Sequence, residues 1–325
     1  MPILPLISLI ILSIFLISKG SDWLTDSLVP IAKKLKTSNV SVGLILVSVV
    51  VSLPEILVAL DSSLRGYQEI SLGVIFGSII CNIGLMTGLS AFIRPLTVTK
   101  SMVLRDGIFS IIVPILIFAI GSNGQITRIE GFAIFLLFIP YLINVFLQEK
   151  RAGSLDEKRT KRDIVIELKL IGLDFGHIQA GWISFSLGLI LLLSGTYLFS
   201  DQLVRMVEIF NIHPFLIGIS LGALVPSIPN IAASFKATQI GLTEVAVSET
   251  IGANIFTLLV TIGIISMIAP ISIDKQLLTF DLPVMIIMSF ILFVFMSSGN
   301  KISKKEGAVL LSSYLMIIFI QIVLS

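Results

Sequence analysis

The feature that most limits how this chain can fold is a series of apolar runs, each about 20 residues long. A transmembrane helix needs about 20 such residues, whereas a strand of a membrane barrel needs about ten with alternating polarity. Charged residues make up only 13% of the 325-residue chain, and the mean hydropathy is +1.06. A soluble domain carries about 25% charged residues. We therefore predict an all-α integral membrane protein with ten transmembrane helices.

The predicted spans lie at residues 3–19, 40–64, 70–93, 103–121, 127–148, 179–200, 213–237, 244–268, 278–298 and 305–324. One long polar segment, from Gln148 to His177, contains many charges of both signs and is typical of a solvated linker. It divides the chain into a first five-helix repeat (1–148), a linker (149–178) and a second five-helix repeat (179–325).

The placement of the basic residues predicts how the chain is oriented. Of the 22 lysines and arginines, 18 fall on one side of the predicted spans, Lys19 and Arg105 among them, and four fall on the other. Loops rich in lysine and arginine stay in the cytoplasm. We therefore expect the linker inside the cell and both termini outside, in the plasma membrane or a cell inner membrane.

The two halves share residues at a constant offset of 175 positions. The pairs are Gly43 and Gly218, Ser52 and Ser227, Pro54 and Pro229, Glu55 and Asn230, Gly66 and Gly241, Glu69 and Glu244, Gly77 and Gly252, and Ser78 and Ala253. Because each half has an odd number of spans, the second half must enter the membrane the opposite way round. Inverted repeats with interrupted helices are typical of secondary transporters that bind their substrate at the membrane midplane.

Glu55 lies next to Pro54 in the middle of a predicted span. A charge at that depth costs roughly 2.5–3.5 kcal/mol on insertion scales, so it marks a candidate functional site. Pro54 removes a backbone N–H from the helix, and we expect this to free carbonyls between Ser48 and Val51. Those carbonyls, the Ser52 hydroxyl and the Glu55 carboxylate form a set of hard oxygen ligands that suits Na⁺ or Ca²⁺.

The next span and the second half supply further candidate ligands. Ser78 and Asn82 are four residues apart and therefore share one helix face. Helix–helix packing is the alternative role for two small polar residues of this kind. The second half offers Ser227, Asn230 and a backbone carbonyl near Ala223 at the corresponding places.

Glu249 is an acid that could replace the carboxylate missing from the second half. It shares one helix face with Ala253 and Thr257 and lies about one turn, roughly 5.4 Å, from Ala253. It either lines the ion pathway or is an acid near a helix N-terminus, stabilised by the helix dipole. The candidate metal ligands are thus Glu55, Ser52, Ser48, Ser78, Asn82, Ala223, Ser227, Asn230 and Glu249.

Three other acids lie at the ends of predicted spans. Glu69 and Glu244 begin equivalent spans, and we expect both to cap their helices. Asp61 lies near the outer end of the second span. It is either a surface acid or a residue that attracts cations into an outer vestibule.

The motifs of the first half are Val50-Val51-Ser52-Leu53-Pro54-Glu55 and Gly77-Ser78-Ile79-Ile80-Cys81-Asn82. Those of the second half are Val225-Pro226-Ser227-Ile228-Pro229-Asn230 and Gly252-Ala253-Asn254-Ile255-Phe256-Thr257. Together they resemble the two α-repeats of the cation/calcium exchanger superfamily, which includes the sodium/calcium exchangers, and the resemblance covers essentially the whole chain. It implies four helices around the ion sites and a first and a sixth span that slide across them to give alternating access.

The chain differs from the family pattern at Val51 and Pro226, where the family usually has threonine or asparagine, and at Asn230, where it usually has a second acid. With Ca²⁺ bound, Glu55 alone leaves one net positive charge in a site of low dielectric constant.

From these features we expect a secondary cation antiporter that moves Ca²⁺ or another cation against Na⁺ or H⁺ through a midplane site centred on Glu55. The alternatives are a Na⁺/H⁺ antiporter for monovalent ions only and a relative that keeps the fold without transporting. The sequence has no nucleophile–histidine pair and no metal-ligand cluster, so we expect no enzymatic activity. We also expect no cofactor, cations and the lipid bilayer as partners, no nucleic acid, and a monomer.

Overall fold

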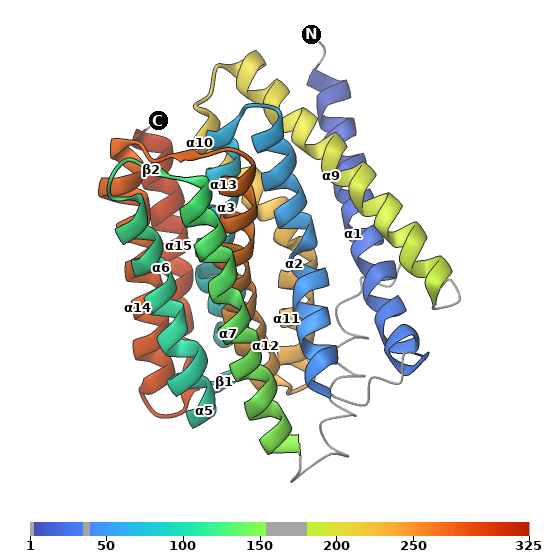
Figure 1. Ribbon diagram of the computed structural model, residues 1–325, viewed down its shortest axis with the longest axis vertical. Coiled ribbons are helices and arrows are strands. Elements are labelled where there is room, and N and C mark those ends of the chain that lie inside the picture. The colour runs from blue at the N-terminus through green and yellow to red at the C-terminus, as the bar shows by residue number, and fades with distance from the viewer. Residues whose placement is uncertain (1–2, 35–39, 154–180, 325) are drawn as a thin grey trace.

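The computed structural model describes residues 3–34, 40–153 and 181–324, which are almost wholly helical (Figure 1). The first half contains α1 (Ile3–Lys34), α2 (Val40–Leu64), α3 (Gln68–Cys81), α4 (Gly88–Ile93), α5 (Lys100–Met102), α6 (Ile108–Gly121) and α7 (Arg128–Gly153). The second half contains α9 (Trp182–Phe210), α10 (Pro214–Ile217), α11 (Ala223–Gln239), α12 (Thr243–Phe256), α13 (Ile262–Ile268), α14 (Leu282–Ser297) and α15 (Lys304–Leu324). The π-helical stretches are η1 (Asn82–Thr87), η2 (Val103–Gly107), η3 (Gly218–Gly222), η4 (Thr257–Thr261) and η5 (Leu277–Asp281). The helical fold predicted from the sequence is therefore confirmed.

Eight helices in the described part of the chain are long and apolar enough to cross a membrane. They cover Ile3–Ser27, Gln68–Ile93, Lys100–Gly121, Trp182–Phe210, Pro214–Gln239, Thr243–Ile268, Leu277–Ser297 and Lys304–Val323. Helices α2 and α7 are not among the eight, and both contain side chains that the structure does not describe. The chain is thus an integral membrane protein, and the count of ten spans stays a prediction.

Three helical runs form the centre of the molecule. In the run that joins α3, η1 and α4, 94% of the 18 most apolar consecutive residues are buried, against 28% in α15. The runs that contain α12 and α11 follow, with 78% and 61%. Since α15 and other peripheral helices expose much more apolar surface, we place α3, α11 and α12 inside the bundle, together with the part of α2 that carries the buried Glu55.

The first helix is longer than the sequence predicts. An end at Lys19 was expected, but α1 continues to Lys34. Lys19 and Asp22 expose only 8% and 5% of their surface, and the Lys19 ammonium lies 5.1 Å from the centre of the Trp23 ring. The assignment of Lys19 to a loop was therefore wrong, because neighbouring side chains accommodate a charge that looks terminal in the sequence. Arg105, also counted with the loop residues, lies in η2.

The predicted linker starts inside a helix, since α7 continues to Gly153. Residues 154–178 of the linker lie outside the described part of the chain. The start of α1 and the end of α15 lie at the same end of the bundle (Figure 1).

The described residues also include two short antiparallel ribbons, which the sequence did not predict. β1 (Leu96–Thr97) pairs with β4 (Lys301–Ile302), and β2 (Gln125–Ile126) pairs with β3 (Ile271–Ser272). β1 and β3 are separated by 175 residues, the offset that relates the two halves of the sequence. The two ribbons lie at opposite ends of the bundle, as the labels β1 and β2 show (Figure 1).

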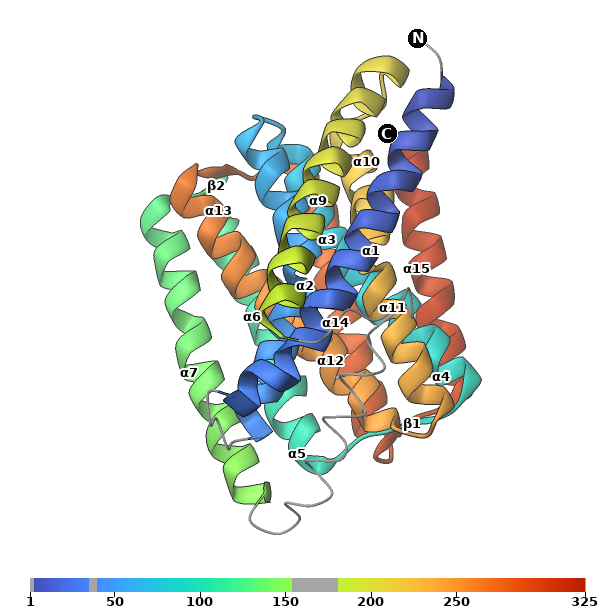
Figure 2. The same cartoon turned by 90° about the vertical axis from the view of Figure 1, so that its right-hand side faces the viewer.

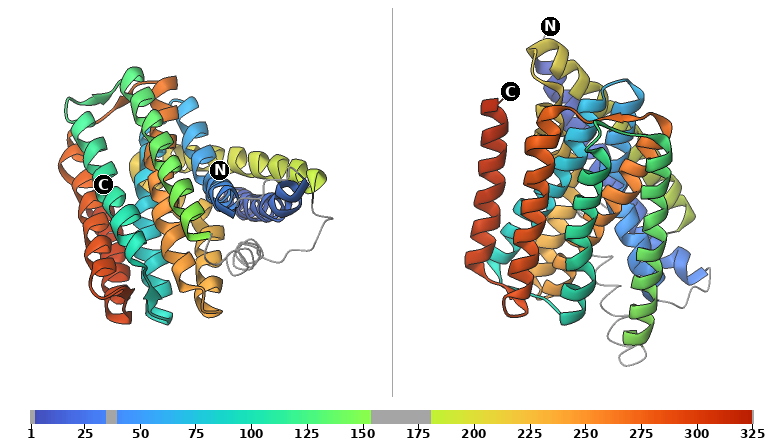
Figure 3. Two further views of the ribbon diagram at one scale, coloured as in Figure 1. Left: turned by 60° about the horizontal axis from the view of Figure 1, so that its bottom comes forward. Right: turned by 60° about the vertical axis from the view of Figure 1, so that its left-hand side comes forward.

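Helices α1 and α9 form a pair at one side of the bundle (Figure 1 and Figure 2), and the left view in Figure 3 shows this pair extending away from the other helices. The two run antiparallel, because Gly20 lies against Leu192 while Gly188 lies against Leu24. A Cβ on Gly20 would come within 2.5 Å of the Leu192 backbone nitrogen, so this close approach requires glycine. The first and sixth predicted spans therefore form one closely packed unit, the α1/α9 pair.

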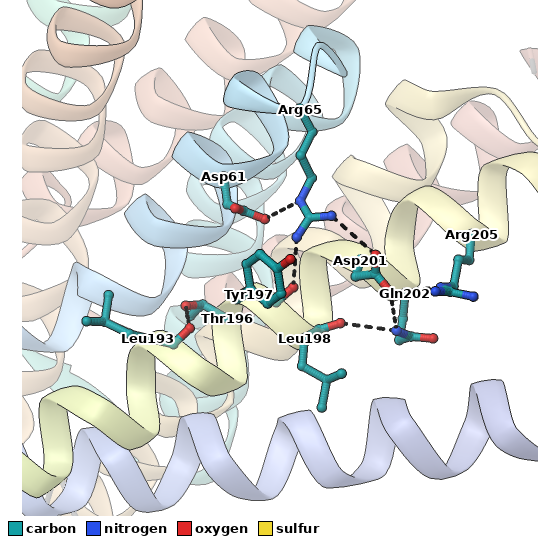
Figure 4. Close-up of polar contacts among 9 residues, drawn as sticks. All are labelled: Asp61, Arg65, Leu193, Thr196, Tyr197, Leu198, Asp201, Gln202 and Arg205. Atoms are coloured by element: carbon teal, nitrogen blue, oxygen red, sulfur yellow. Dashed lines mark hydrogen bonds and ion pairs between the residues drawn. The ribbon is translucent and has the colours of Figure 1, made fainter.

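A polar cluster at the end of α2 joins the α1/α9 pair to the bundle (Figure 4). Arg65 donates from Nε to Asp61 at 2.7 Å and from Nη1 to Asp201 of α9 at 3.2 Å. The Arg65 guanidinium also lies 4.5 Å from the centre of the Tyr197 ring, and Asp201 accepts from Arg205 at 2.7 Å. Asp61, placed by the sequence at the outer end of its span, is thus an ion-pair partner of Arg65.

Arg65→Met would remove two ion pairs and a cation–π contact while keeping much of the apolar stem. These partly exposed interactions together contribute about 1–2 kcal/mol to stability. We therefore expect a lower melting temperature of the purified protein in detergent, measured by intrinsic fluorescence. Arg205→Met, which removes one more exposed ion pair on α9, is the control and should have a smaller effect. Equal melting temperatures for Arg65→Met and the wild type would show that the cluster does not hold α9 to the bundle.

Candidate cation site

Glu55 is buried where α2 meets α11, with 1% of its surface exposed. Its Oε1 accepts hydrogen bonds from Ser227 Oγ at 2.6 Å and from Asn230 Nδ2 at 3.3 Å. Its Oε2 is buried and has no hydrogen-bond partner among the described residues. The structure therefore brings together Glu55 and the residue at the equivalent position of the second half, and it leaves one carboxylate oxygen unsatisfied.

The predicted ligands from α2 and α3 lie beside this carboxylate. Ser52 lies about one turn before Glu55 on α2, and Ser78 of α3 faces the Glu55 carboxyl group. Asn82, one turn beyond Ser78, starts η1, and all three side chains are fully buried. Within the described part of the chain, the Oγ atoms of Ser52 and Ser78 and the Oδ1 atoms of Asn82 and Asn230 have no hydrogen-bond partner. Five predicted ligands thus each present an unsatisfied buried oxygen, the Glu55 Oε2 included.

Pro54 does not break its helix, because α2 is continuous from Val40 to Leu64. The predicted interruption near Ser48 is therefore wrong, and the side chain of Ser48 lies outside what the structure describes. The effect of Pro54 is local, since its missing N–H leaves only the Val50 carbonyl, four residues earlier, without a helical donor.

Irregular backbone appears instead as π-helical turns in the three central helical runs. η1 starts at Asn82 and η4 at Thr257, which are equivalent positions of the two halves, and η3 ends directly before Ala223. Such turns are rare and occur frequently at functional sites. These departures from regular helix lie on the partner helices of α2, where the sequence did not predict them.

The second half presents a backbone oxygen to Ser227, the residue that also contacts Glu55. Ser227 Oγ lies 2.6 Å from Glu55 Oε1 and 2.9 Å from the Ala223 carbonyl oxygen. A hydroxyl has one hydrogen, so Ser227 donates to only one of these acceptors at a time. Pro226 lacks an N–H, which leaves the Gly222 carbonyl, the neighbour of Ala223, without its helical donor.

Glu249 is buried on α12, with 7% of its surface exposed. It lies beyond the first turn of a helix that starts at Thr243, so the helix dipole does not account for its position. Glu69 and Glu244 lie in the first turns of α3 and α12 as predicted, but neither helix has a side-chain capping hydrogen bond.

The sequence did not predict the contacts that α12 makes with η1. Asn82 Nδ2 donates to Asn254 Oδ1 at 3.1 Å, and the hydroxyls of Thr87 and Thr250 lie 2.8 Å apart. Asn254 and Thr250 are four residues apart and therefore lie on one face of α12. This spacing was visible in the sequence, but its meaning depends on knowing that α12 lies against η1.

The chemistry of this site suits hard cations. Its unsatisfied atoms are the oxygens of hydroxyls, amides and one carboxylate, which are preferred by Na⁺ and Ca²⁺ over soft metals. The described residues contain no group of three or more histidine, cysteine, aspartate or glutamate side chains that could hold a metal ion.

The family model described as "Sodium/calcium exchanger protein" matches residues 5–147 and 180–323, which cover both halves. The chain belongs to the sodium/calcium exchanger family. It is therefore a transporter, a cation antiporter of the exchanger type, and the resemblance seen in the sequence motifs is confirmed.

Other exchangers and membrane proteins align with this family member over most of its length. The sodium/calcium exchanger MaX1 of Methanosarcina acetivorans is 28% identical over 333 residues, which cover 94% of this chain and 95% of that protein. The inner membrane protein YrbG of Escherichia coli is 28% identical over 284 residues, which cover 87% and 86%. The structure of the sodium–calcium exchanger NCX_Mj soaked with Na⁺ and Ca²⁺ is 27% identical, covers 98% of this chain and 99% of that chain, and has a TM-score of 0.67. The exchanger fold thus extends over the whole chain.

Ser227→Ala would remove the shorter of the two hydrogen bonds to Glu55 and one hydroxyl oxygen. We expect the KM for the transported cation to rise about tenfold, the effect of losing roughly 1.4 kcal/mol of binding. Ion uptake into proteoliposomes at a series of cation concentrations measures it. Ser234→Ala is the matched control, because Ser234 is buried on the same face of α11 but bonds to Ser90 instead of Glu55. A KM that rises equally in both variants would contradict a specific role for Ser227.

Proposed function

We propose that this exchanger binds its transported cations in a midplane site centred on Glu55. The other ligands are Ser52, Ser78, Asn82, Ser227 and Asn230, with the Val50 carbonyl, close to Ser48, and a backbone carbonyl near Ala223. The observation that carries the proposal is the Oε2 atom of Glu55, a carboxylate oxygen buried without a donor in the described part of the chain. An ionised carboxylate in that state is strongly unfavourable, so a cation or a proton completes the site.

This requirement supplies a mechanism for exchange. If the protein closed around an ionised Glu55 with no cation bound, it would bury an uncompensated charge, which is energetically unfavourable. The occupied site is neutral or nearly so, and its closure is easier. The site therefore switches its access from one side of the membrane to the other only with a cation or a proton bound. One species can leave for good only if the other takes its place. On this mechanism Ca²⁺ or another cation moves against Na⁺ or H⁺.

The charge of the site favours a second candidate, exchange of monovalent ions only. Asn230 contacts Glu55 through its amide nitrogen, at a place where a second carboxylate would help to neutralise Ca²⁺. Glu55 alone balances one Na⁺ or one proton, whereas Ca²⁺ leaves a net positive charge unless Glu249 contributes. Uptake of ⁴⁵Ca²⁺, and competition between Ca²⁺ and Na⁺, distinguish the two candidates. A wild-type protein that moves no cation would support a relative that keeps the fold without transporting.

We also infer that residues 1–148 and 179–325 are inverted repeats. The ribbons at opposite ends of the bundle, the antiparallel α1 and α9, and the π-helical turns that start at Asn82 and Thr257 support this arrangement. The start of α1 and the end of α15 lie at one end of the bundle (Figure 1), and the distribution of basic residues supports termini outside the cell and a linker in the cytoplasm.

Glu55→Gln keeps the size of the side chain but removes its charge. We expect uptake of Na⁺ or Ca²⁺ driven by an ion gradient to fall to the level of protein-free liposomes, because no other carboxylate contacts Ser227 and Asn230 in the described structure. Glu244→Gln, which changes an exposed acid in the first turn of α12, is the control and should transport normally. Unchanged flux through folded Glu55→Gln would refute the site.

Asn230→Asp would place a second carboxylate next to Glu55, where the amide nitrogen now lies at 3.3 Å. Two adjacent carboxylates repel each other and attract a divalent ion more strongly than a monovalent one. We expect the KM for Ca²⁺ to fall at least about tenfold relative to that for Na⁺. The exposed Asn123→Asp is the control for an added charge. Unchanged selectivity in Asn230→Asp would show that this position does not face the bound ion.

A further inference from the structure

We infer that Asn254 is a positioning residue of the cation site, which holds the Asn82 side chain with its oxygen directed to the ion. The inference rests on the function proposed above, because it takes Asn82 as a ligand. The sequence pattern alone marks Asn254 only as part of a motif and gives it no role.

The contact is a single hydrogen bond between two buried amides. Asn82 Nδ2 donates to Asn254 Oδ1 at 3.1 Å, and the two residues expose 0% and 4% of their surface. Asn82 Oδ1 is buried and has no hydrogen-bond partner within the described structure. Because the NH₂ end of Asn82 is engaged by Asn254, the oxygen is the end left for a cation.

Asn82 lies on the same helix face as Ser78, which faces Glu55. An amide side chain has a broad, roughly two-fold terminal torsion, so its oxygen and nitrogen exchange places at little intrinsic cost. A rotated Asn82 would present N–H groups, which repel a cation, to the site. The acceptor on Asn254 disfavours this rotation, because the rotated amide would set two oxygen atoms against each other unless the Asn254 amide turned as well.

The second half has no need of an equivalent residue. The position equivalent to Asn254 is Ile79, and the position equivalent to Asn82 is Thr257. A hydroxyl offers the same oxygen as donor and as acceptor, so Thr257 needs no partner to select which atom faces the ion. An orienting residue is therefore needed only in the half where the proposed ligand is an amide, Asn82, and Asn254 fills that role.

A neighbouring pair holds the same helices together without touching the Asn82 side chain. Thr250 lies one turn from Asn254 on α12, and its hydroxyl lies 2.8 Å from that of Thr87 in η1. This pair separates the effect of helix packing from that of amide orientation, since Thr250→Val removes an interhelical hydrogen bond with little change of shape.

The test compares variants reconstituted in proteoliposomes, with the initial rate of ²²Na⁺ and ⁴⁵Ca²⁺ uptake as the readout. Asn254→Leu removes the acceptor at similar volume, and we expect the KM of the transported ion to rise about tenfold while kcat changes less than about twofold. Asn254→Asp keeps the acceptor oxygen, so its KM should equal the wild-type value or lie below it, in contrast to Asn254→Leu. Thr250→Val should leave KM unchanged.

Asn82→Ala provides the second readout. If Asn254 acts through Asn82, adding Asn254→Leu to Asn82→Ala raises KM no further. An unchanged KM in Asn254→Leu, an equal rise in the Asn82→Ala background, or an equal rise in Thr250→Val would each overturn the inference. Asn254→Ala serves in place of Asn254→Leu if the leucine variant does not fold.

The same assays distinguish a failure of this inference from a failure of the proposed Glu55 site. If Glu55→Gln abolishes uptake while Asn254→Leu transports with normal KM, the Glu55 site stands and the role of Asn254 falls. If Glu55→Gln transports normally, the proposed site itself falls.

Discussion

The burial of one carboxylate inside a membrane-spanning bundle is the constraint on which the rest of the structure depends. Glu55 has 1% of its surface exposed, so a negative charge on it has to be offset by nearby dipoles and, in the proposed function, by a bound cation or proton. Ser227 and Asn230 supply two donors, both to Oε1, and the second oxygen stays open. An open carboxylate oxygen supports the proposed binding site, because most buried acceptors in proteins have a donor.

The neighbours of Glu55 come close because small residues line the helix contacts. A Cβ on Gly77 would lie 2.6 Å from both the Ala223 Cβ and the Ile219 carbonyl oxygen, so α3 can approach η3 and α11 only with glycine at this position. That approach places Ser78, the next residue, beside the carboxylate that α11 contacts from the other half. The packing between the two halves therefore also brings the residues of the proposed site together.

The molecule separates the helices that hold the site from those at its side. The predicted ligands all lie on the runs that contain α2, α3, α11 and α12, whereas the α1/α9 pair carries none of them. The pair is joined internally by close backbone contact at Gly20 and Gly188, and it is tied to the bundle at Arg65 by partly exposed ion pairs (Figure 4). Interactions of the second kind are weak and reversible. The pair also contributes Ile17, Leu24 and Phe199 to the main hydrophobic core, so apolar packing holds it to the bundle beside these ion pairs.

Much of this architecture follows from local sequence information. Apolar runs of bilayer length predict membrane helices, and the 175-residue offset pairs Glu55 with Asn230, which the structure brings into contact. Chain order, however, does not reveal which helix lies beside which. The burial of Lys19 inside α1, the continuity of α2 through Pro54, and the hydrogen bond from Asn82 to Asn254 all depend on neighbours distant in sequence. A buried polar group is stable only with a partner, and partners are set by packing, so these features emerge only when the helices are assembled.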